Sequence, residues 1–192
     1  MHLDNSDNPV AFTLPYVAQK TIECGYQGRV TVAHIPSLSN VPDRLAFKAI
    51  ELIKEADLNV CILPSRIKLT RVRELMAAGV NVICGTDNMQ DAFIQLGNAD
   101  MLNAMLLLAQ VTGMGFDDEL ESIYKTGTSN AARALRIANE YGIGEGKRAD
   151  LVILEAESVP EAIRNQAGRF AVIKGGVIVA RKGCIPVVKW YP

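Results

Sequence analysis

Two histidines and one aspartate are placed along the chain so that they could bind a metal ion together. His34 directly follows the apolar run at residues 30–33, and Asp87 comes shortly after the apolar run at residues 80–84. His2 stands where a strand would end, although almost no strand precedes it. Zinc and iron(II) accept imidazole nitrogen and carboxylate oxygen, and they lower the pKa of bound water to near neutrality. The three side chains therefore predict one divalent metal, zinc or iron(II), in a hydrolytic site.

Each of these residues also has a simpler interpretation. A histidine at a strand end, such as His34, often serves as a hydrogen-bonded structural residue. The start of a chain, where His2 lies, is commonly disordered. An aspartate in a loop, such as Asp87, often caps the helix that follows. Only the joint placement of the three side chains at strand ends favours the metal site.

The elements that must position these residues alternate between strand and helix. Parallel strands joined by crossover helices give this order, and near-continuous apolar strands are typical of a sheet covered on both faces. The carboxyl ends of such strands meet at one edge, where ligands bind in α/β folds. We expect strands at residues 29–33, 58–63 and 80–84, with helices at 42–56 and 70–78.

The segment before the first full strand is expected to be helical. Asp7, Asn8 and Pro9 are typical of a helix start, and Gly25 suits its carboxyl-terminal cap. Pro15 is expected to kink or restart this helix. A polar loop is expected at residues 35–40.

The pattern changes towards the end of the chain. Short strands are expected at 150–154, 170–173 and 177–180, with a short helix at 161–166 and further helices at 99–111, 116–125 and 130–141. Lys174-Gly175-Gly176 is a hairpin signal, so this region predicts a small antiparallel β unit. We therefore expect a first unit at residues 1–147 and a β unit at 148–192.

Composition, charge and motifs exclude several classes of partner and of reaction. The chain has 192 residues, is 49% hydrophobic and 21% charged, and carries a formal net charge of −1. This charge gives no reason to expect nucleic acid or a membrane surface as partner. The cysteines are widely spaced and form no Cys-x-x-Cys pair, which favours reduced thiols and a cytoplasmic location. Neither a Gly-x-Ser-x-Gly elbow nor a phosphate-binding loop is present.

Several segments together resemble a known family. They are His-x-Asp at 2–4, Val-Thr-Val-Ala-His at 30–34, Ala-Gly-Val-Asn-Val-Ile-Cys-Gly-Thr-Asp-Asn at 78–88, Thr-Ser-Asn-Ala-Ala at 128–132 and Gly-Ile-Gly-Glu-Gly-Lys-Arg-Ala-Asp-Leu-Val-Ile-Leu at 142–154. In these segments the chain resembles the C-terminal half of the amidohydrolase superfamily, most closely its cytosine deaminase branch. The resemblance implies an α/β fold, a partial (β/α)8 TIM-type barrel of strands five to eight followed by a small antiparallel β unit.

The resemblance also assigns roles to the candidate residues. His2 matches the metal histidine after barrel strand five, and His34 matches the histidine after strand six. Asp87 matches the aspartate after strand eight, which binds the metal or orients the attacking water. The implied reaction is hydrolytic deamination of a small heterocyclic substrate, or hydrolysis of a related cyclic C–N bond.

Two departures from the family pattern leave alternatives open. The family's His-x-His pair and barrel strands one to four are absent from this sequence. Asn5 stands where the deaminases carry a proton-shuttling glutamate, and an amide is a poor acid or base, so Asp4 or Asp7 would have to substitute. The chain is therefore expected to be either such an enzyme's C-terminal half or a non-catalytic fragment or subunit, with a plain α/β binding module as a third possibility.

The open edges of half a barrel give an expectation about assembly. Exposed sheet edges invite pairing with another chain. We expect a homo-oligomer or a complementary N-terminal half, and a gene fragment that starts at an internal methionine would account for the missing strands, although not for Asn5.

Overall fold

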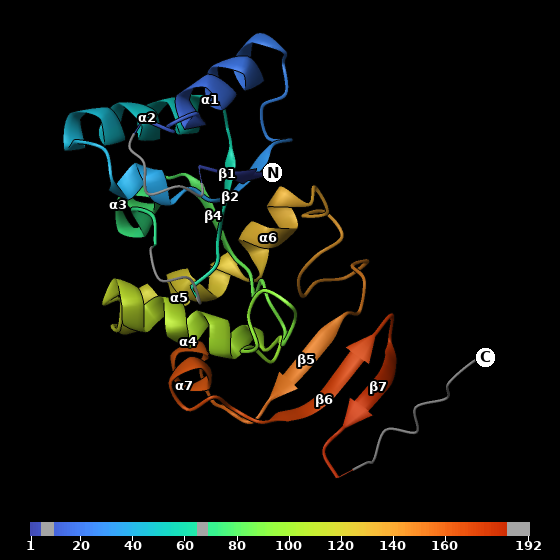
Figure 1. Ribbon diagram of the computed structural model, residues 1–192. Helices are drawn as coiled ribbons and strands as arrows, with labels where there is room; N and C mark the ends of the chain where they lie inside the picture. Colours follow the sequence, from blue (N-terminus) through green and yellow to red (C-terminus); the bar gives the residue numbers. More distant parts are fainter. Residues whose placement is uncertain (5–9, 65–68, 184–192) are drawn as a thin grey trace.

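The structure is a computed structural model that describes residues 1–4, 10–64 and 69–183. Within this part of the chain, strands form one parallel sheet and one separate antiparallel sheet (Figure 1). The predicted α/β class with a parallel sheet and an antiparallel unit is confirmed.

The parallel sheet has the order β1-β2-β3-β4, so strands that follow one another in sequence lie side by side. The strands are β1 (His2–Leu3), β2 (Thr31–His34), β3 (Asn59–Ile62) and β4 (Asn81–Cys84). All neighbouring pairs are parallel, and Leu3 lies in register with His34. The carboxyl ends of the strands therefore meet at one edge, as the sequence predicts.

The two faces of this sheet differ in burial. Val32, Val60 and Val82 lie in register and are fully buried. Their neighbours Cys61 and Ile83, which point to the opposite face, are only half-buried. Asn59 and Asn81, on the same face at the amino end of the strands, are buried. Parallel sheets are normally covered on both faces, so this face is incompletely covered towards its carboxyl end.

Helices pack against the sheet and against one another. They are α1 (Leu14–Glu23), the 3₁₀ helix η1 (Pro36–Ser39), α2 (Asp43–Glu55), α3 (Val72–Ala77), α4 (Met101–Thr112), α5 (Asp117–Thr126), α6 (Ser129–Ala134) and α7 (Val159–Arg164). The carboxylate of Asp100 caps α4 by accepting hydrogen bonds from the N–H groups of Leu102 and Asn103. Gly113, with φ +67°, ends this helix. In the part of the chain that is described, no helix is long and apolar enough to cross a bilayer.

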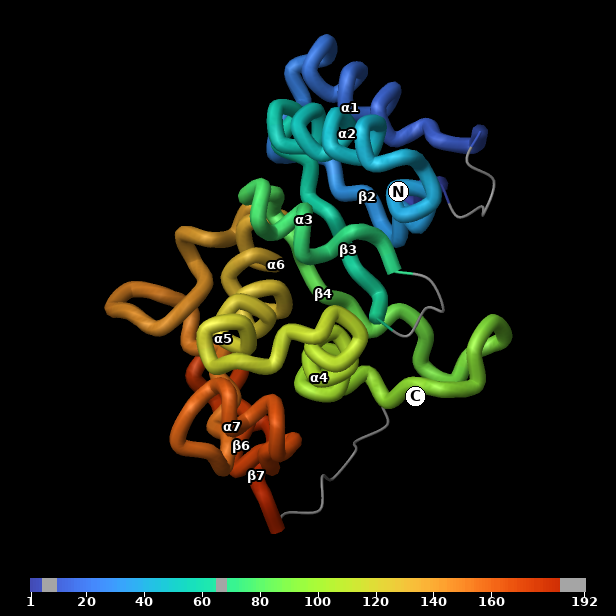
Figure 2. Tube along the Cα trace, turned by 90° about the vertical axis from the view of Figure 1, so that its left-hand side faces the viewer, coloured from blue at the N-terminus to red at the C-terminus, as the bar shows by residue number. Residues whose placement is uncertain are grey.

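The antiparallel unit contains β5 (Leu151–Leu154), β6 (Arg169–Lys174) and β7 (Val177–Arg181) in this order. The β6–β7 hairpin turns through Gly175 and Gly176, both with positive φ, as the sequence predicts. Helix α7 links this unit to α4 and α5. Figure 2 shows the unit at the opposite end of the molecule from α1 and α2. The unit boundary at residue 147 stays a prediction.

The prediction that the first helix starts at residues 7–9 is wrong in the described part. Helix α1 begins at Leu14, while Val10 lies outside it with its side chain 88% exposed. Pro15 stands in the first turn, where its missing N–H is tolerated, so it starts the helix rather than kinking it. Asp7, Asn8 and Pro9 themselves lie outside the described residues.

Two other local predictions need correction. The segment expected as a polar loop at 35–40 contains η1, and it buries the side chains of Ile35 and Leu38 completely. The helix expected over 130–141 ends at Ala134, because Arg136 adopts the left-handed conformation, with φ +61°. Apolar side chains beyond this point are therefore exposed rather than packed.

Candidate active site

The two histidines face each other across β1 and β2: His2 is the first residue of the two-residue strand β1, and His34 is the last residue of β2. Nδ1 of His2 lies 2.7 Å from Nε2 of His34, and the ring centroids are 4.7 Å apart. One of these nitrogens donates a hydrogen bond and the other accepts it, according to the tautomers. His34 is buried and His2 is exposed, so the pair opens towards solvent on the His2 side.

The start of the chain is held by pairing with β2. The amino group of Met1 donates to the carbonyl oxygen of Thr31 at 2.7 Å, and the N–H of Ala33 donates to the carbonyl oxygen of Met1 at 2.9 Å. Both bonds are made by Met1, so they hold the backbone directly before His2 against β2.

The backbone is strained where the sequence places candidate residues. Asp4, His34 and Asp87 have φ values of +53°, +72° and +57°. A residue with a Cβ atom is disfavoured in this left-handed region by about 1–2 kcal/mol. Such conformations cluster at functional sites, because the surrounding structure must hold them there.

Asp4 is engaged with the start of α1. Its carboxylate accepts hydrogen bonds from the N–H and hydroxyl of Thr13, at 3.0 and 2.5 Å, and from the N–H of Leu14 at 3.0 Å. Both carboxylate oxygens are occupied by these donors, so a role for Asp4 as substitute proton shuttle has no support here. Asn5 and Asp7 lie outside the described residues.

Asp87 lies in the exposed loop after β4. Its negative charge is felt at Cys61, where burial first and this carboxylate second raise the pKa of the thiol. Among residues 1–4, 10–64 and 69–183, no three His, Cys, Asp or Glu side chains form a group that could hold a metal ion. The structure thus brings His2 and His34 together, and it does not add Asp87 to them as a third ligand. Asp87 is not the cap of the next helix either, because Asp100 caps α4.

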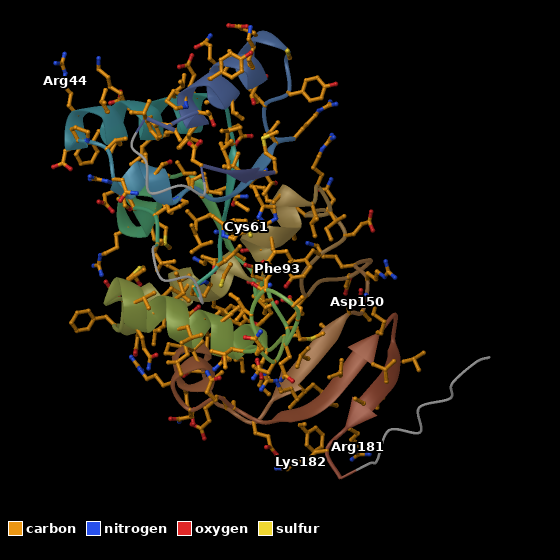
Figure 3. All side chains as sticks on the ribbon, in the orientation of Figure 1. Arg44, Cys61, Phe93, Asp150, Arg181 and Lys182 are labelled. Atoms are coloured by element: carbon orange, nitrogen blue, oxygen red, sulfur yellow. The ribbon has the colours of Figure 1, made fainter. Side chains whose placement is uncertain are left out.

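The loop after Asp87 is closed by its own hydrogen bonds. Asp91 accepts hydrogen bonds from the side-chain amide of Asn88 and from the N–H groups of Phe93 and Ile94. These bonds, with that of Asn88 the largest, hold the pKa of Asp91 below its ordinary value. The carbonyl oxygen of Asn88 approaches Gly97 so closely that a Cβ there would lie 2.3 Å from it. The loop is a compact structure that exposes Phe93 (labelled in Figure 3).

A cavity of about 350 Å³ lies between this loop, the end of β3 and helix α4. Its wall is mainly apolar, with a few amides and one carboxylate. The lining residues are Pro64, Gly85, Thr86, Asn88, Ile94, Leu96, Gly97, Asn98, Ala99, Asp100, Asn103, Ala104 and Leu107. The residues on either side of Asp87 belong to the wall, so the cavity reaches the candidate site at the end of β4. Its size and mixed lining suit a small organic ligand.

Two cysteines near the site are not apparent as site residues from the sequence. Cys61, labelled in Figure 3, shares the half-buried face of the sheet with Ile83. Burial raises the pKa of the Cys84 thiol to about 12, and the neighbouring Cys61 adds to this effect. Both groups are protonated thiols at neutral pH, so neither is an activated nucleophile.

The amino end of the sheet holds a network of buried asparagines. The amide of Asn81 donates to Oδ1 of Asn59 at 2.7 Å and to the carbonyl oxygen of Asn130 at 3.1 Å. The amide of Asn130 donates in turn to the carbonyl oxygen of Val82 at 3.0 Å. The segment at 128–132 thus fixes α6 to the amino end of β4. The histidines lie on other strands, β1 and β2.

Comparison with known proteins finds similar sequences over nearly the whole chain. The model of the amidohydrolase family matches residues 1–180. N-isopropylammelide isopropyl amidohydrolase of Pseudomonas sp. strain ADP is 36% identical over 94% of this chain and 45% of its own length. Pterin deaminase of Rhizobium rhizogenes strain K84 is 27% identical over 93% of this chain and 44% of its own length.

A solved structure gives the same picture. The 5-methylcytosine deaminase of Klebsiella pneumoniae, liganded with 5-fluorocytosine, superposes with a TM-score of 0.89 at 30% identity. The match covers 96% of this chain and 48% of that enzyme. The chain therefore spans about half the length of the relatives that it matches.

Proposed function

The chain belongs to the amidohydrolase family, and we propose that it forms the C-terminal half of a metal-dependent, cytosine deaminase-like hydrolase active in the cytoplasm. The proposed reaction is hydrolysis of a C–N bond in a cyclic amidine or related heterocycle. The proposed fold is a partial (β/α)8 barrel in which β1 to β4 are strands five to eight. The relatives whose names describe hydrolysis or deamination of small heterocycles support this assignment.

The contact between Nδ1 of His2 and Nε2 of His34 carries the proposal. The two ring nitrogens lie on adjacent strands at a hydrogen-bond distance of 2.7 Å. Two imidazole ligands on a tetrahedral zinc ion are about 3.3 Å apart, so the rings need to separate by only about half an ångström, with loss of the shared proton, to bind one ion. Imidazole nitrogen suits zinc and iron(II), so the donor set fits the proposed metal. When bound, such an ion supplies the acidity that makes water a nucleophile near neutral pH.

The chain's own residues have distinct proposed roles. His2 and His34 hold the ion, in neutral forms that present Nδ1 and Nε2 to it. Asp87 orients the attacking water and accepts its proton, or serves as a further ligand to the ion. Asn5 occupies the family's glutamate position, and its amide can position a substrate by hydrogen bonding but cannot carry a proton at neutral pH.

The cavity at the end of β4 supports a small heterocyclic substrate. Its apolar residues would contact the ring faces, while the amides of Asn88, Asn98 and Asn103 offer donors and acceptors to ring nitrogens and exocyclic groups. The cavity wall includes Thr86 and Asn88, on either side of Asp87, so a ring bound there would lie beside the residue proposed to orient the attacking water.

Two features of the sheet support a requirement for a second polypeptide. The face that contains Cys61 and Ile83 is only half-buried, and β1, at the sheet edge, has two residues in the described chain. Open edges and uncovered apolar faces favour association. We propose that a second copy of this chain or a complementary N-terminal half covers them.

One observation favours the alternative of a non-catalytic fragment or subunit. Within the described residues, His2 and His34 are not joined by a third ligand side chain. Catalytic zinc sites normally have three protein ligands, so in this alternative the chemistry would depend on ligands from elsewhere.

Metal loading of the purified full chain separates these two possibilities. We expect close to one zinc ion per chain after loading and buffer exchange, measured by mass spectrometry, and loss of this zinc in His34→Ala. His34→Gln, which keeps a polar side chain, should behave like His34→Ala, while Asn165→Ala at an exposed helix end should retain the metal. Ammonia or amine release is then measured with 5-methylcytosine, pterin and N-isopropylammelide. Equal zinc in the parent chain and in both His34 variants would exclude the histidine pair as the site.

A further inference from the structure

The loop that follows β1 is tied to the start of α1 by a single side chain. We infer that Asp4 is a positioning residue for His2, and that its bonds to Thr13 and Leu14 set the direction in which His2 Nδ1 points. This inference deepens the proposed function and rests on it for the identity of His2 as a metal ligand. The contact that it concerns, between two histidine rings, is present without any metal.

Strand β1 alone cannot fix the position of His2. The strand consists of His2 and Leu3 in the described chain, and it is paired on one side only, with β2. A short edge strand has few hydrogen bonds, so its end frays unless something else holds it. The residue that leaves the strand, Asp4, has φ +53°, a conformation that must be held by other contacts.

Asp4 supplies the contacts that hold the end of β1. Its two oxygens accept four hydrogen bonds in total, three from Thr13 and one from Leu14. Thr13, the N-cap residue of α1, makes no side-chain capping bond of its own among the described residues. The Asp4 carboxylate therefore takes the place of the missing side-chain cap. Because Asp4 directly follows β1, its hydrogen bonds tie the end of β1 to the first N–H groups of α1.

The hydrogen bonds of Asp4 link the histidine pair to helix α1. Helix α1 is anchored in the core through Leu14 and Ala18, which are fully buried. Asp4 transmits this fixed position to a backbone segment only two residues from His2. On the other side of the contact, His34 is held by burial and by the strained end of β2. The short nitrogen–nitrogen distance thus depends on two rigid supports, one of which is Asp4.

The chain offers a simple spectroscopic test because it contains two histidines. Long-range ¹H–¹⁵N spectra of the full, metal-free chain report both imidazoles, and a ring-to-ring nuclear Overhauser effect reports their contact. We expect this contact in the parent chain, its loss in Asp4→Ala and partial retention in Asp4→Asn, whose amide oxygen can still accept from Thr13 or Leu14. Ser158→Ala, which removes the cap of α7 instead, should leave the contact unchanged.

Zinc affinity gives the second readout, measured by competition with a chromogenic chelator. Residues that hold metal ligands in place typically change affinity about 10-fold or more when removed, so we expect Asp4→Ala to bind zinc about 10-fold more weakly. An intact ring contact and unchanged affinity in Asp4→Ala would overturn the inference. If the ring contact depends on Asp4 but no variant or parent chain binds zinc, the positioning role stands and the proposed function fails.

Discussion

The two ends of the parallel sheet are built from the same strands but in opposite ways. At the amino end, buried neutral amides satisfy one another: Asn81 bonds to Asn59 and Asn130 in a closed network. At the carboxyl end, His34 and Asp87 hold left-handed backbone conformations, and titratable groups face one another or solvent. Near the amino end the positive φ values fall on Gly28 and Gly79, which tolerate them, and on Asp57, which is tied to Arg133 by an ion pair of 2.6 Å.

The difference indicates that stability and chemistry are separated along each strand. Buried, fully bonded amides strengthen a fold because each lost partner leaves an unsatisfied polar group. Strained residues weaken a fold and persist where their side chains must take a particular direction. In barrel enzymes the amino-terminal face serves stability and the carboxyl-terminal face carries catalysis. The asymmetry of this sheet is of that kind.

The largest effect on stability is expected at the amino end. Asn81→Ala removes the donor to both Asn59 Oδ1 and the carbonyl oxygen of Asn130, in a site where Asn81 is 6% exposed. Leaving these buried acceptors unsatisfied should lower the free energy of unfolding by about 2–3 kcal/mol, measured by urea denaturation. The ratio of zinc to folded chain should not change.

A matched control tests whether this loss comes from the network. Asn165→Ala replaces an exposed asparagine at the end of α7 and should change the free energy of unfolding by about 0.5 kcal/mol or less. If Asn81→Ala instead lost zinc while keeping its stability, the assignment of the two ends would be reversed.

A smaller, local effect is expected in the loop at the carboxyl end. In Gly97→Ala the new Cβ would lie 2.3 Å from the carbonyl oxygen of Asn88, and φ at this position is +108°. The loop must therefore open, at a local cost of about 1–3 kcal/mol, and hydrogen exchange at residues 88–98 should accelerate. The asparagine network should keep its protection.

Gly113→Ala is the matched control for backbone conformation alone. Gly113 also has a positive φ, but a Cβ there would meet no atom within 4 Å. We expect Gly113→Ala to leave exchange in the 88–98 loop at the parent rate. Equal acceleration in both variants would show that the close approach of Asn88 to Gly97 does not hold the loop closed.

Part of the fold is predictable from the sequence alone. Strand order, the parallel sheet and the antiparallel unit follow from hydrophobic patterns and turn residues, because those signals are local. The prediction for α6 failed where Arg136 adopts a left-handed conformation, since its sequence continues a helical pattern. The α1 start was misplaced because its cap comes from Asp4, across a gap that no spacing rule reveals.

For the site, the sequence places His2 and His34 at adjacent strand ends, and the structure brings their rings together. The roles of His2, His34, Asp87 and Asn5 in metal binding and catalysis stay predictions. The asparagine network was not predictable, because it joins residues from two strands and a helix whose relative register exists only in the folded chain. The half-buried position of Cys61 was not predictable for a similar reason, because it depends on how the strands align and on what covers them.

The smallest expected effect is a loosening of the 88–98 loop at low pH. It distinguishes the two ends of the sheet, because only the carboxyl end has a titrating side chain in the compared region. Asp91 has a pKa below its ordinary value of about 3.9, chiefly because of the Asn88 amide and then the N–H groups of Ile94 and Phe93. A carboxyl group whose pKa is lower in the folded state stabilises that state above its unfolded pKa. That stabilisation is lost as the pH falls through the folded pKa, so the 88–98 loop should loosen below about pH 4.

The amino-end network contains only amides, which do not titrate, so its hydrogen-exchange protection should not follow the same pH dependence. Comparing exchange at pH 6 and pH 3, corrected for the intrinsic rate at each pH, measures both regions in one sample. Asp91→Asn removes the titrating group and should make the loop equally open at both pH values. If the parent loop kept its protection at a pH at which the carboxyl ¹³C shift of Asp91 shows the protonated form, the loop would be held by its backbone bonds between Gln90 and Leu96 and between Asp91 and Ile94, and not by the carboxylate.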